Sequence, residues 1–186
     1  MTRSFRRYSC VTVVLSAGLV VCAAASAAIN GVGAGTATFD AVGPAGMRIE
    51  GKTTQVSVAE QTGSLTVTIS AGTFDTGIEL RNRHMREKYL ETGKYPAAIF
   101  TVARSAIQFP ADGADASGSV AGTLSLHGQT KPVTVNYKAH RTGDTYAVTG
   151  TTHVKMTDYG IDVPSYLGVT VKPDVDVSVS FSARDN

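Results

Sequence analysis

The sequence of 186 residues contains no tryptophan, and its only two cysteines, Cys10 and Cys22, lie near its start. The rest of the chain therefore holds no disulfide and offers no thiol nucleophile. A Gly-x-Ser-x-Gly segment is absent as well, which excludes the nucleophile elbow of the α/β-hydrolases. No stretch reaches the roughly 20 apolar residues that a membrane-spanning helix requires.

The start of the chain has the pattern of a secretory signal peptide. Three arginines within residues 1–7 precede an apolar run, Cys10–Ala25, that ends in small residues. We therefore predict that residues 1–27 are cleaved and that residues 28–186 form a single exported domain. A lipid anchor on Cys22 is the less favoured alternative, because three bulky apolar residues stand immediately before it.

The charge balance of the predicted mature chain is close to neutral. Without the three arginines of the signal peptide, the 17 basic residues fall to 14, against 15 acidic residues, which gives a net charge of −1. Nucleic acid is therefore not an expected partner.

Most of the remaining sequence alternates between apolar and polar residues, the pattern of half-buried strands. The alternation is clearest over residues 169–181, and strands at 120–126 and 133–139 predict a hairpin around a turn at 127–130. Further strands are predicted at Thr36–Val42, Met47–Gly51, Gln55–Val58, Leu65–Ile69, Ile99–Phe109 and Tyr146–Met156.

About nine strands joined by short connections predict an all-β fold, either a barrel or a sandwich. The inward positions carry mainly Val, Ala, Gly and Thr. A barrel of about eight strands lined by such small side chains has room for one ligand, whereas a filled sandwich can use the same residues.

Residues 80–100 interrupt the alternation of apolar and polar residues with a charged segment that favours a helix. Ile78, Met85 and Tyr89 share one face of a helix predicted over about residues 78–92. This helix is expected to cap or line the barrel.

The basic residues of the interruption fit two interpretations, a solvated helix face or a site for an anionic head group near an opening. They are Arg81, Arg83, Arg86, Lys88 and Lys94. Glu79, Glu87 and Glu91 are interleaved with them, and opposite charges so arranged generally pair on a surface helix. The solvated face is therefore the favoured interpretation.

No metal site is predicted, because none of the four histidines forms a closely spaced ligand pair. They are His84, His127, His140 and His153. A small secreted hydrolase that uses Asp158 and Asp162 with His84 or His127 is an alternative. Carboxylates close to glycines more often form turns, as is expected of Asp158 before Gly160.

Several separated motifs resemble, in the same order, those of the YceI-like polyisoprenoid-binding proteins over roughly residues 35–183. The motifs are Thr76-Gly77, Arg81-Asn82-Arg83-His84-Met85, Lys88-Tyr89-Leu90, Tyr95-Pro96 with Phe100, residues 122–133, and Tyr159-Gly160-Ile161. The resemblance implies an extended lipocalin-like antiparallel barrel, exported to the periplasm, whose apolar interior holds a long isoprenoid or related lipid. It implies no catalytic residue and no cofactor. Asn82 stands where many members carry Asp, and the first strand lacks the histidine-containing start common in the family.

We therefore expect a non-enzymatic protein that sequesters or carries an isoprenoid-type lipid, such as a polyprenol or a quinone, or another long-chain amphiphile. The residues expected near the ligand are Phe39, Met85, Tyr89, Leu90, Tyr95, Phe100, Tyr159 and Tyr166. A structural or interaction barrel with a filled interior and no ligand is a further alternative. Exposed strand edges are compatible with a homodimer, and no sequence pattern requires one.

Overall fold

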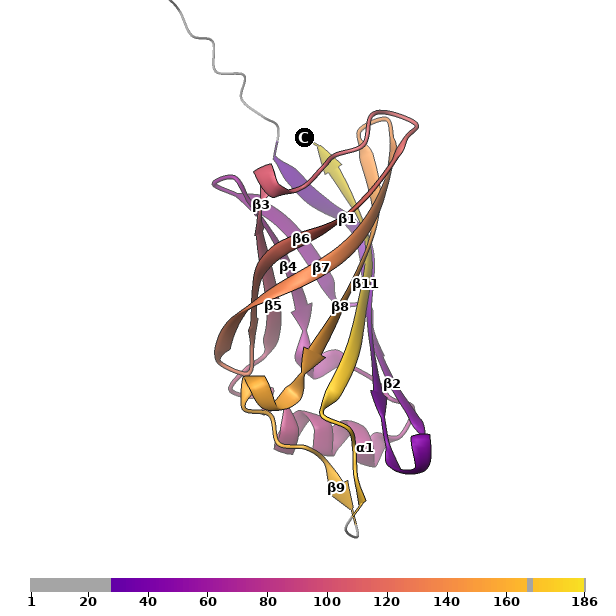
Figure 1. Ribbon diagram of the computed structural model, residues 1–186, viewed down its shortest axis with the longest axis vertical. Helices are drawn as coiled ribbons and strands as arrows, with labels where there is room; N and C mark the ends of the chain where they lie inside the picture. The colour runs from indigo at the N-terminus through magenta and orange to yellow at the C-terminus, as the bar shows by residue number, and fades with distance from the viewer. Residues whose placement is uncertain (1–27, 167–168, 186) are drawn as a thin grey trace, which may run out of the picture.

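The computed structural model describes residues 28–166 and 169–185, so the predicted signal peptide, residues 1–27, lies outside the described residues. Strands dominate the chain, and one short helix accompanies them (Figure 1). The strands are β1 (Ile29–Val42), β2 (Arg48–Thr53), β3 (Val56–Gln61), β4 (Ser64–Ser70), β5 (Ala97–Ala103), β6 (Asp115–Leu126), β7 (Gln129–Thr142), β8 (Thr145–Lys155), β9 (Ser165–Tyr166), β10 (Val169–Thr170) and β11 (Asp174–Asp185). The helical elements are α1 (Glu79–His84), the π-helical turn η3 (Met85–Tyr89), and the 3-10 turns η1 (Pro44–Gly46), η2 (Ala71–Thr73), η4 (Arg104–Ala106) and η5 (Met156–Tyr159).

The main sheet closes into an antiparallel barrel of eight strands, as the sequence predicts. Neighbouring strands follow the order β1, β3, β4, β5, β6, β7, β8 and β11, and β11 pairs with β1 to complete the circle. β3 pairs with β1 only near the start of β1. The second half of β1 pairs instead with the additional strand β2. The β1–β2 hairpin therefore extends beyond the body of the barrel at the lower end in Figure 1.

Alternation places apolar residues inside the barrel and polar residues outside. In β11, Val175 and Ala183 are buried, whereas Asp176 and Ser178 are exposed. The predicted hairpin is β6–β7, whose two-residue turn carries positive φ at both His127 and Gly128. Positive φ at both positions defines a type I′ turn, which matches the twist of the strands it joins.

Two predicted strands are shorter than expected. The alternation over residues 169–181 is divided, because β10 pairs with β9 in a separate small hairpin and β11 begins only after Pro173. Proline has no N–H to donate to a sheet ladder. The strand predicted at Ile99–Phe109 ends at Ala103, where the chain enters η4.

The predicted helix is present as α1 followed by η3.

The buried side chains form two clusters along the barrel. The first contains Ile29, Val58, Leu65, Val67, Val102, Val120 and Ala183. The second contains Val154, Tyr159 and Ile161, with Tyr89 and Leu90 packed against it, so it joins η3 to the barrel wall. None of the helices in the described part of the chain has the length and apolar character needed to cross a bilayer.

Candidate ligand-binding cavity

The barrel encloses a cavity of about 870 Å³. Inward residues of most barrel strands line it, and residues of α1 and η3 complete the wall at the helix end. This volume lies in the upper part of the range of roughly 300–1,000 Å³ that is usual for small-molecule sites. The inward side chains are thus too small to fill the barrel they enclose.

The cavity is long, as the positions along β8 show. Alternate residues of the strand from Tyr146 to Val154 line it, and so does Met156 directly after the strand, which makes ten residue steps in all. At about 3.3 Å per residue and a strand tilt of roughly 40°, these steps cover about 25 Å along the barrel axis. The shape is that of a tunnel suited to an extended chain.

The cavity reaches the surface at the helix end. Met47, Ile78 and Leu80 all line it, and their exposed fractions are 54%, 53% and 54%. Met47 follows η1 at the tip of the β1–β2 hairpin, and the other two residues lie at the start of α1. Figure 1 shows α1 and this hairpin together at the lower end of the barrel. The mouth therefore has an apolar rim.

The opposite end of the barrel carries a group of polar contacts. Arg104 pairs with Glu60 and lies 3.5 Å from Asp185, and the Tyr146 hydroxyl donates to Asp185 (3.3 Å). Burial, and next the charge of Asp185, raise the pKa of Tyr146 above its usual value, so its phenol stays protonated at neutral pH. These contacts tie the ends of β3, β8 and β11 together, and Ile29 N donates to Glu60 as well.

Five of the eight residues that the sequence suggests for ligand contact line the cavity. They are Phe39, Met85, Tyr89, Leu90 and Phe100. Phe39 lies on β1 and packs edge-on against Phe74, with 5.2 Å between ring centroids. These residues come from β1, β5 and the helical segment, which lie far apart in the sequence, so barrel closure brings them together.

Tyr95 and Tyr159 lie outside the cavity wall. The Tyr95 ring packs on His127, with 4.6 Å between centroids, and Tyr159 is buried in the second cluster. His127 also bonds to Glu91 (2.9 Å) and to the Tyr159 carbonyl oxygen (3.1 Å). The two tyrosines thus fasten the segment after η3 to the barrel. The Tyr166 side chain lies outside the described part of the structure.

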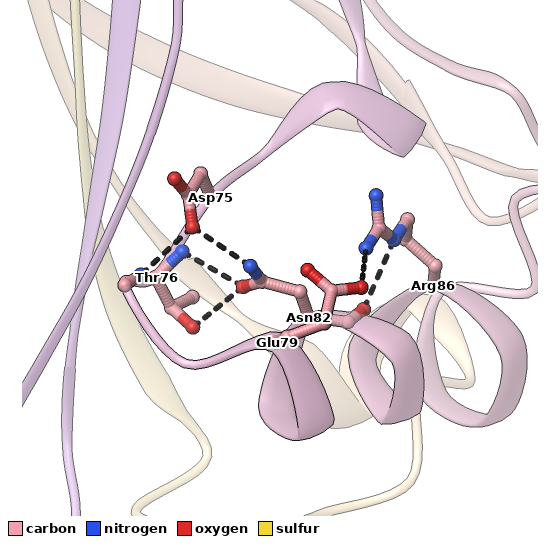
Figure 2. A network of polar contacts seen from close by, with 6 residues as sticks. Asp75, Thr76, Glu79, Asn82 and Arg86 are labelled. Atoms are coloured by element: carbon pink, nitrogen blue, oxygen red, sulfur yellow. Dashed lines mark hydrogen bonds and ion pairs between the residues drawn. The ribbon is translucent and has the colours of Figure 1, made fainter.

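A buried asparagine holds α1 in place at the mouth (Figure 2). Asn82, only 5% exposed, accepts hydrogen bonds from the backbone N–H (2.8 Å) and the hydroxyl (2.7 Å) of Thr76. Its amide nitrogen donates to Asp75 (2.7 Å), which also accepts from the Gly77 N–H (2.8 Å). Asp75 and Lys52 exchange two backbone hydrogen bonds of 2.9 Å each, so this network connects α1 to β2.

Arg81 is the only charged side chain among the described residues that line the cavity. Its Nε donates to the Thr76 hydroxyl (2.8 Å), and its Nη2 donates to the Thr76 carbonyl oxygen. The favoured sequence interpretation, a solvated basic face, is therefore wrong for this residue and fits the exposed Arg83 and Lys88. In the sequence, the only sign of this contact is that Arg81 lies five residues after Thr76.

The Asp75 carboxylate should make the stability of this region depend on pH. Hydrogen bonds from the Gly77 N–H and then from Asn82 lower its pKa below the ordinary value of 3.8. A carboxylate whose pKa is lower in the folded state than in the unfolded state stabilises the fold at any pH above the unfolded-state pKa. This stabilisation is lost as the pH falls through the folded-state pKa. We expect the thermal midpoint to fall more steeply for the native protein than for Asp75→Asn between about pH 5 and pH 2.5, measured by circular dichroism. Equal slopes would contradict this role.

The residues of the hydrolase alternative make no hydrogen bond or ion pair with one another. His127 is engaged by Glu91 and Tyr159, and His84 lies on α1 at the cavity wall. Asp158 and Asp162 are exposed, and neither bonds to either histidine. The described residues also contain no group of three or more His, Cys, Asp or Glu arranged to hold a metal ion.

Comparison with known proteins places this geometry in a family. The model of the YceI-like domain matches residues 25–183. The chain belongs to the YceI-like domain family. Among curated relatives, a UPF0312 protein of Shewanella denitrificans is 35% identical over 108 residues, which cover 53% of each chain. The YceI protein of an Escherichia coli strain is 34% identical over 111 residues, or 59% of this chain and 47% of that protein. This YceI-like chain thus spans about half the length of the curated relatives it matches.

Solved structures share the barrel of this YceI-like chain. A polyisoprenoid binding domain from Saccharophagus degradans, described as implicated in plant cell wall breakdown, superposes with a TM-score of 0.73 at 20% identity, covering 86% of this chain and 99% of that domain. BcnA of Burkholderia cenocepacia superposes with a TM-score of 0.64 at 20% identity, covering 80% and 95%. At these identities the likeness establishes the fold.

Proposed function

We propose that this protein binds one long-chain isoprenoid-type lipid in its barrel and sequesters or carries it without chemical change. The observation that carries the proposal is the apolar cavity of about 870 Å³, open at the helix end. The Saccharophagus neighbour, described as a polyisoprenoid binding domain, supports the same class of ligand. A barrel with a filled interior is disfavoured by the same volume.

The length of the cavity suits a long extended chain, because the lining from Tyr146 to Met156 covers about 25 Å along the barrel axis. Each 100 Å² of apolar ligand surface removed from water contributes about 2.5 kcal/mol, which ordering of the chain partly offsets.

The proposal places the protein in the periplasm, in keeping with the predicted signal peptide over residues 1–27. A non-enzymatic role is supported by the contacts of His127, which go to Glu91 and to the Tyr159 carbonyl oxygen and not to Asp158 or Asp162. Homodimerisation and the lack of a nucleic-acid partner stay predictions, and lipid binding requires neither.

The proposal is tested by native mass spectrometry of protein purified without detergent from its own host, followed by lipid extraction. We expect a mass increment of one long-chain lipid per chain, lost on extraction and restored by added geranylgeraniol. Protein that is consistently ligand-free and that also fails to take up the added isoprenoid would overturn the proposal.

A further inference from the structure

We propose that the rim of the cavity mouth docks on the surface of an anionic lipid bilayer, so that a lipid chain passes between the bilayer and the tunnel without crossing water. The docking surface consists of the tip of the β1–β2 hairpin, residues 41–47, and the start of α1. This inference goes beyond ligand binding to a partner surface, and it rests on the proposed lipid-binding function for its purpose.

The first observation is that the most exposed large apolar side chains of the described residues gather at the mouth. Met47, Ile78 and Leu80 are each more than half exposed, and the next in exposure are Val32 at 38% and Ile99 at 36%. The three rim residues line the cavity, whereas Val32 and Ile99 lie outside its wall. Exposed apolar side chains gathered in this way mark a site of protein or membrane interaction.

The second observation is the composition of the hairpin tip. Residues 41–47 read Ala-Val-Gly-Pro-Ala-Gly-Met and contain no polar side chain. Turns that face water usually include Asn, Asp or Ser, yet Ala45, Gly46 and Met47 are all exposed. The tip and α1 lie together at the lower end of the barrel (Figure 1), so one partner surface can contact both.

The third observation is an excess of positive charge on the helical segment beside the rim. Residues 79–94 carry five basic and three acidic side chains, a net charge of +2, whereas the remainder of the predicted mature chain carries −3. Two of the three carboxylates are already paired, but Arg83 and Lys88 form no ion pair within the described residues. Free cations next to exposed aliphatic side chains are typical of segments that lie in the interface of an anionic bilayer.

The position of the tunnel favours a bilayer as the partner. The cavity opens within the apolar rim, so a surface that covers the rim also faces the open tunnel. A bilayer both covers apolar side chains and supplies an apolar chain. Each 100 Å² of that chain exposed to water disfavours its transfer by about 60-fold, a barrier that direct contact removes.

A tryptophan reporter tests insertion of the rim, because the chain has no tryptophan of its own. Leu80→Trp is mixed with vesicles of phosphatidylcholine and phosphatidylglycerol. We expect its emission to shift to shorter wavelength and to be quenched by phospholipids with brominated acyl chains. Val32→Trp, near the start of β1 and away from the mouth, should show neither change. A Leu80→Trp emission that does not respond to vesicles would overturn the proposal.

Co-flotation with the same vesicles measures the affinity of delipidated protein in the absence of any isoprenoid. Met47→Ser combined with Leu80→Ser removes roughly 100 Å² of exposed apolar surface, so the partition coefficient should fall about 60-fold. The matched double variant, Val32→Ser with Ile99→Ser, removes two exposed apolar side chains outside the cavity wall and should bind as the wild type does. Circular dichroism confirms that both variants are folded. Equal binding by the two double variants would show that the rim is not the docking surface.

The charge of the bilayer is tested separately. Arg83→Gln with Lys88→Gln should weaken binding to vesicles that contain phosphatidylglycerol by about 25-fold, at about five-fold for each cation. Binding to pure phosphatidylcholine should not change. Lys138→Gln removes an exposed cation from β7 and serves as the control, with little expected effect. If the helix variant keeps the full preference for phosphatidylglycerol, the partner is not selected by its anionic charge.

Transfer kinetics and membrane-free uptake separate this proposal from the lipid-binding function. Transfer of a fluorescent isoprenoid from loaded protein should accelerate in proportion to vesicle concentration, whereas a rate independent of vesicles would show that the chain crosses water. Geranylgeraniol delivered from cyclodextrin measures the cavity alone. A wild type that takes it up but binds no vesicle retains the lipid-binding function and overturns docking in favour of a protein partner. A wild type that binds vesicles through the rim but takes up no isoprenoid retains the docking surface and loses the lipid-binding function.

Discussion

Replacing Gly150 with phenylalanine should block the cavity near its middle and weaken the binding of long-chain lipids by roughly 60-fold. Gly150 lies on the cavity wall between the ends marked by Tyr146 and Met156. A Cβ at this position would meet the Cγ1 atoms of Val135 and Val179 at 3.3 Å, so a ring attached to it must extend into the open space. Excluding about 100 Å² of ligand surface costs about 2.5 kcal/mol, which gives the stated factor.

The matched control places the same ring on the outside of the same strand. Thr149 is exposed on the outer face of β8, and Thr149→Phe should leave lipid binding unchanged. Displacement of a fluorescent long-chain probe measures the affinities. A ligand of only two isoprene units, which fits between the mouth and residue 150, should bind the Gly150→Phe variant nearly as well as the wild type. Unchanged affinity of Gly150→Phe for geranylgeraniol would show that the chain does not occupy the tunnel.

The barrel could be predicted because each strand carries its own pattern. Alternation in β11 distinguishes inward Val175 from outward Asp176 without any knowledge of the partners. The presence of a cavity could not be predicted in the same way. Small inward residues such as Gly150 fit either a packed sandwich or an open barrel. The number and tilt of the strands set the width of the interior and so determine whether these side chains fill it.

The candidate site was predictable where it depends on local periodicity. Met85 and Tyr89 are four residues apart, so an α-helix or a π-helical turn places them on one face, and both line the cavity. Aromatic character alone was a poorer guide. Tyr95 and Tyr159 pack around His127 and in the second cluster, because burial in a wall and contact with a ligand favour the same residue types.

The charge pattern of the helix predicted a solvated position for Arg81, and the structure shows why this differs. Interleaved acidic and basic residues normally pair along a helix, and Arg86 with Glu79 does so at 3.0 Å. The orientation of Arg81 depends instead on Thr76, which lies outside the helix and is held by Asn82. Such a contact arises from the loop conformation before α1, where Gly77 has a φ of 78° that pattern arguments do not supply.

The Asn82 network should be the most sensitive polar feature of the fold. Asn82→Ala removes three side-chain hydrogen bonds from a residue that is 5% exposed. At 0.5–1.5 kcal/mol each, the expected loss in free energy of unfolding is about 2–4 kcal/mol. For a chain of this size, the thermal midpoint should fall by roughly 5–12 °C. Arg83→Ala, at the exposed neighbouring position, should change it by no more than about 1–2 °C.

An aspartate at position 82 provides the sharper test, because it keeps the shape and changes one atom. In Asn82→Asp the two bonds from Thr76 can persist, but the nitrogen that donates to Asp75 at 2.7 Å becomes an oxygen. Two carboxylates at that distance cannot both be ionised cheaply, so the shared pKa rises above the unfolded value. The variant should therefore be less stable than the wild type at pH 7 and approach it as the pH falls through the raised pKa.

The double variant Asp75→Asn with Asn82→Asp should recover part of the stability that Asn82→Asp loses at neutral pH. The amide nitrogen introduced at position 75 can donate to the carboxylate introduced at position 82. The recovery is partial, because Asp75 Oδ1 accepts from both Asn82 and the Gly77 N–H, and an amide that turns its nitrogen to residue 82 gives up the bond from Gly77. Thermal unfolding of the two single variants and the double variant at pH 7 measures the coupling as a double-mutant cycle. If the double variant is no more stable than Asn82→Asp alone, the hydrogen bond between positions 75 and 82 does not hold the helix. In that case Thr76 and Arg81 would be positioned by the packing of α1 against the barrel.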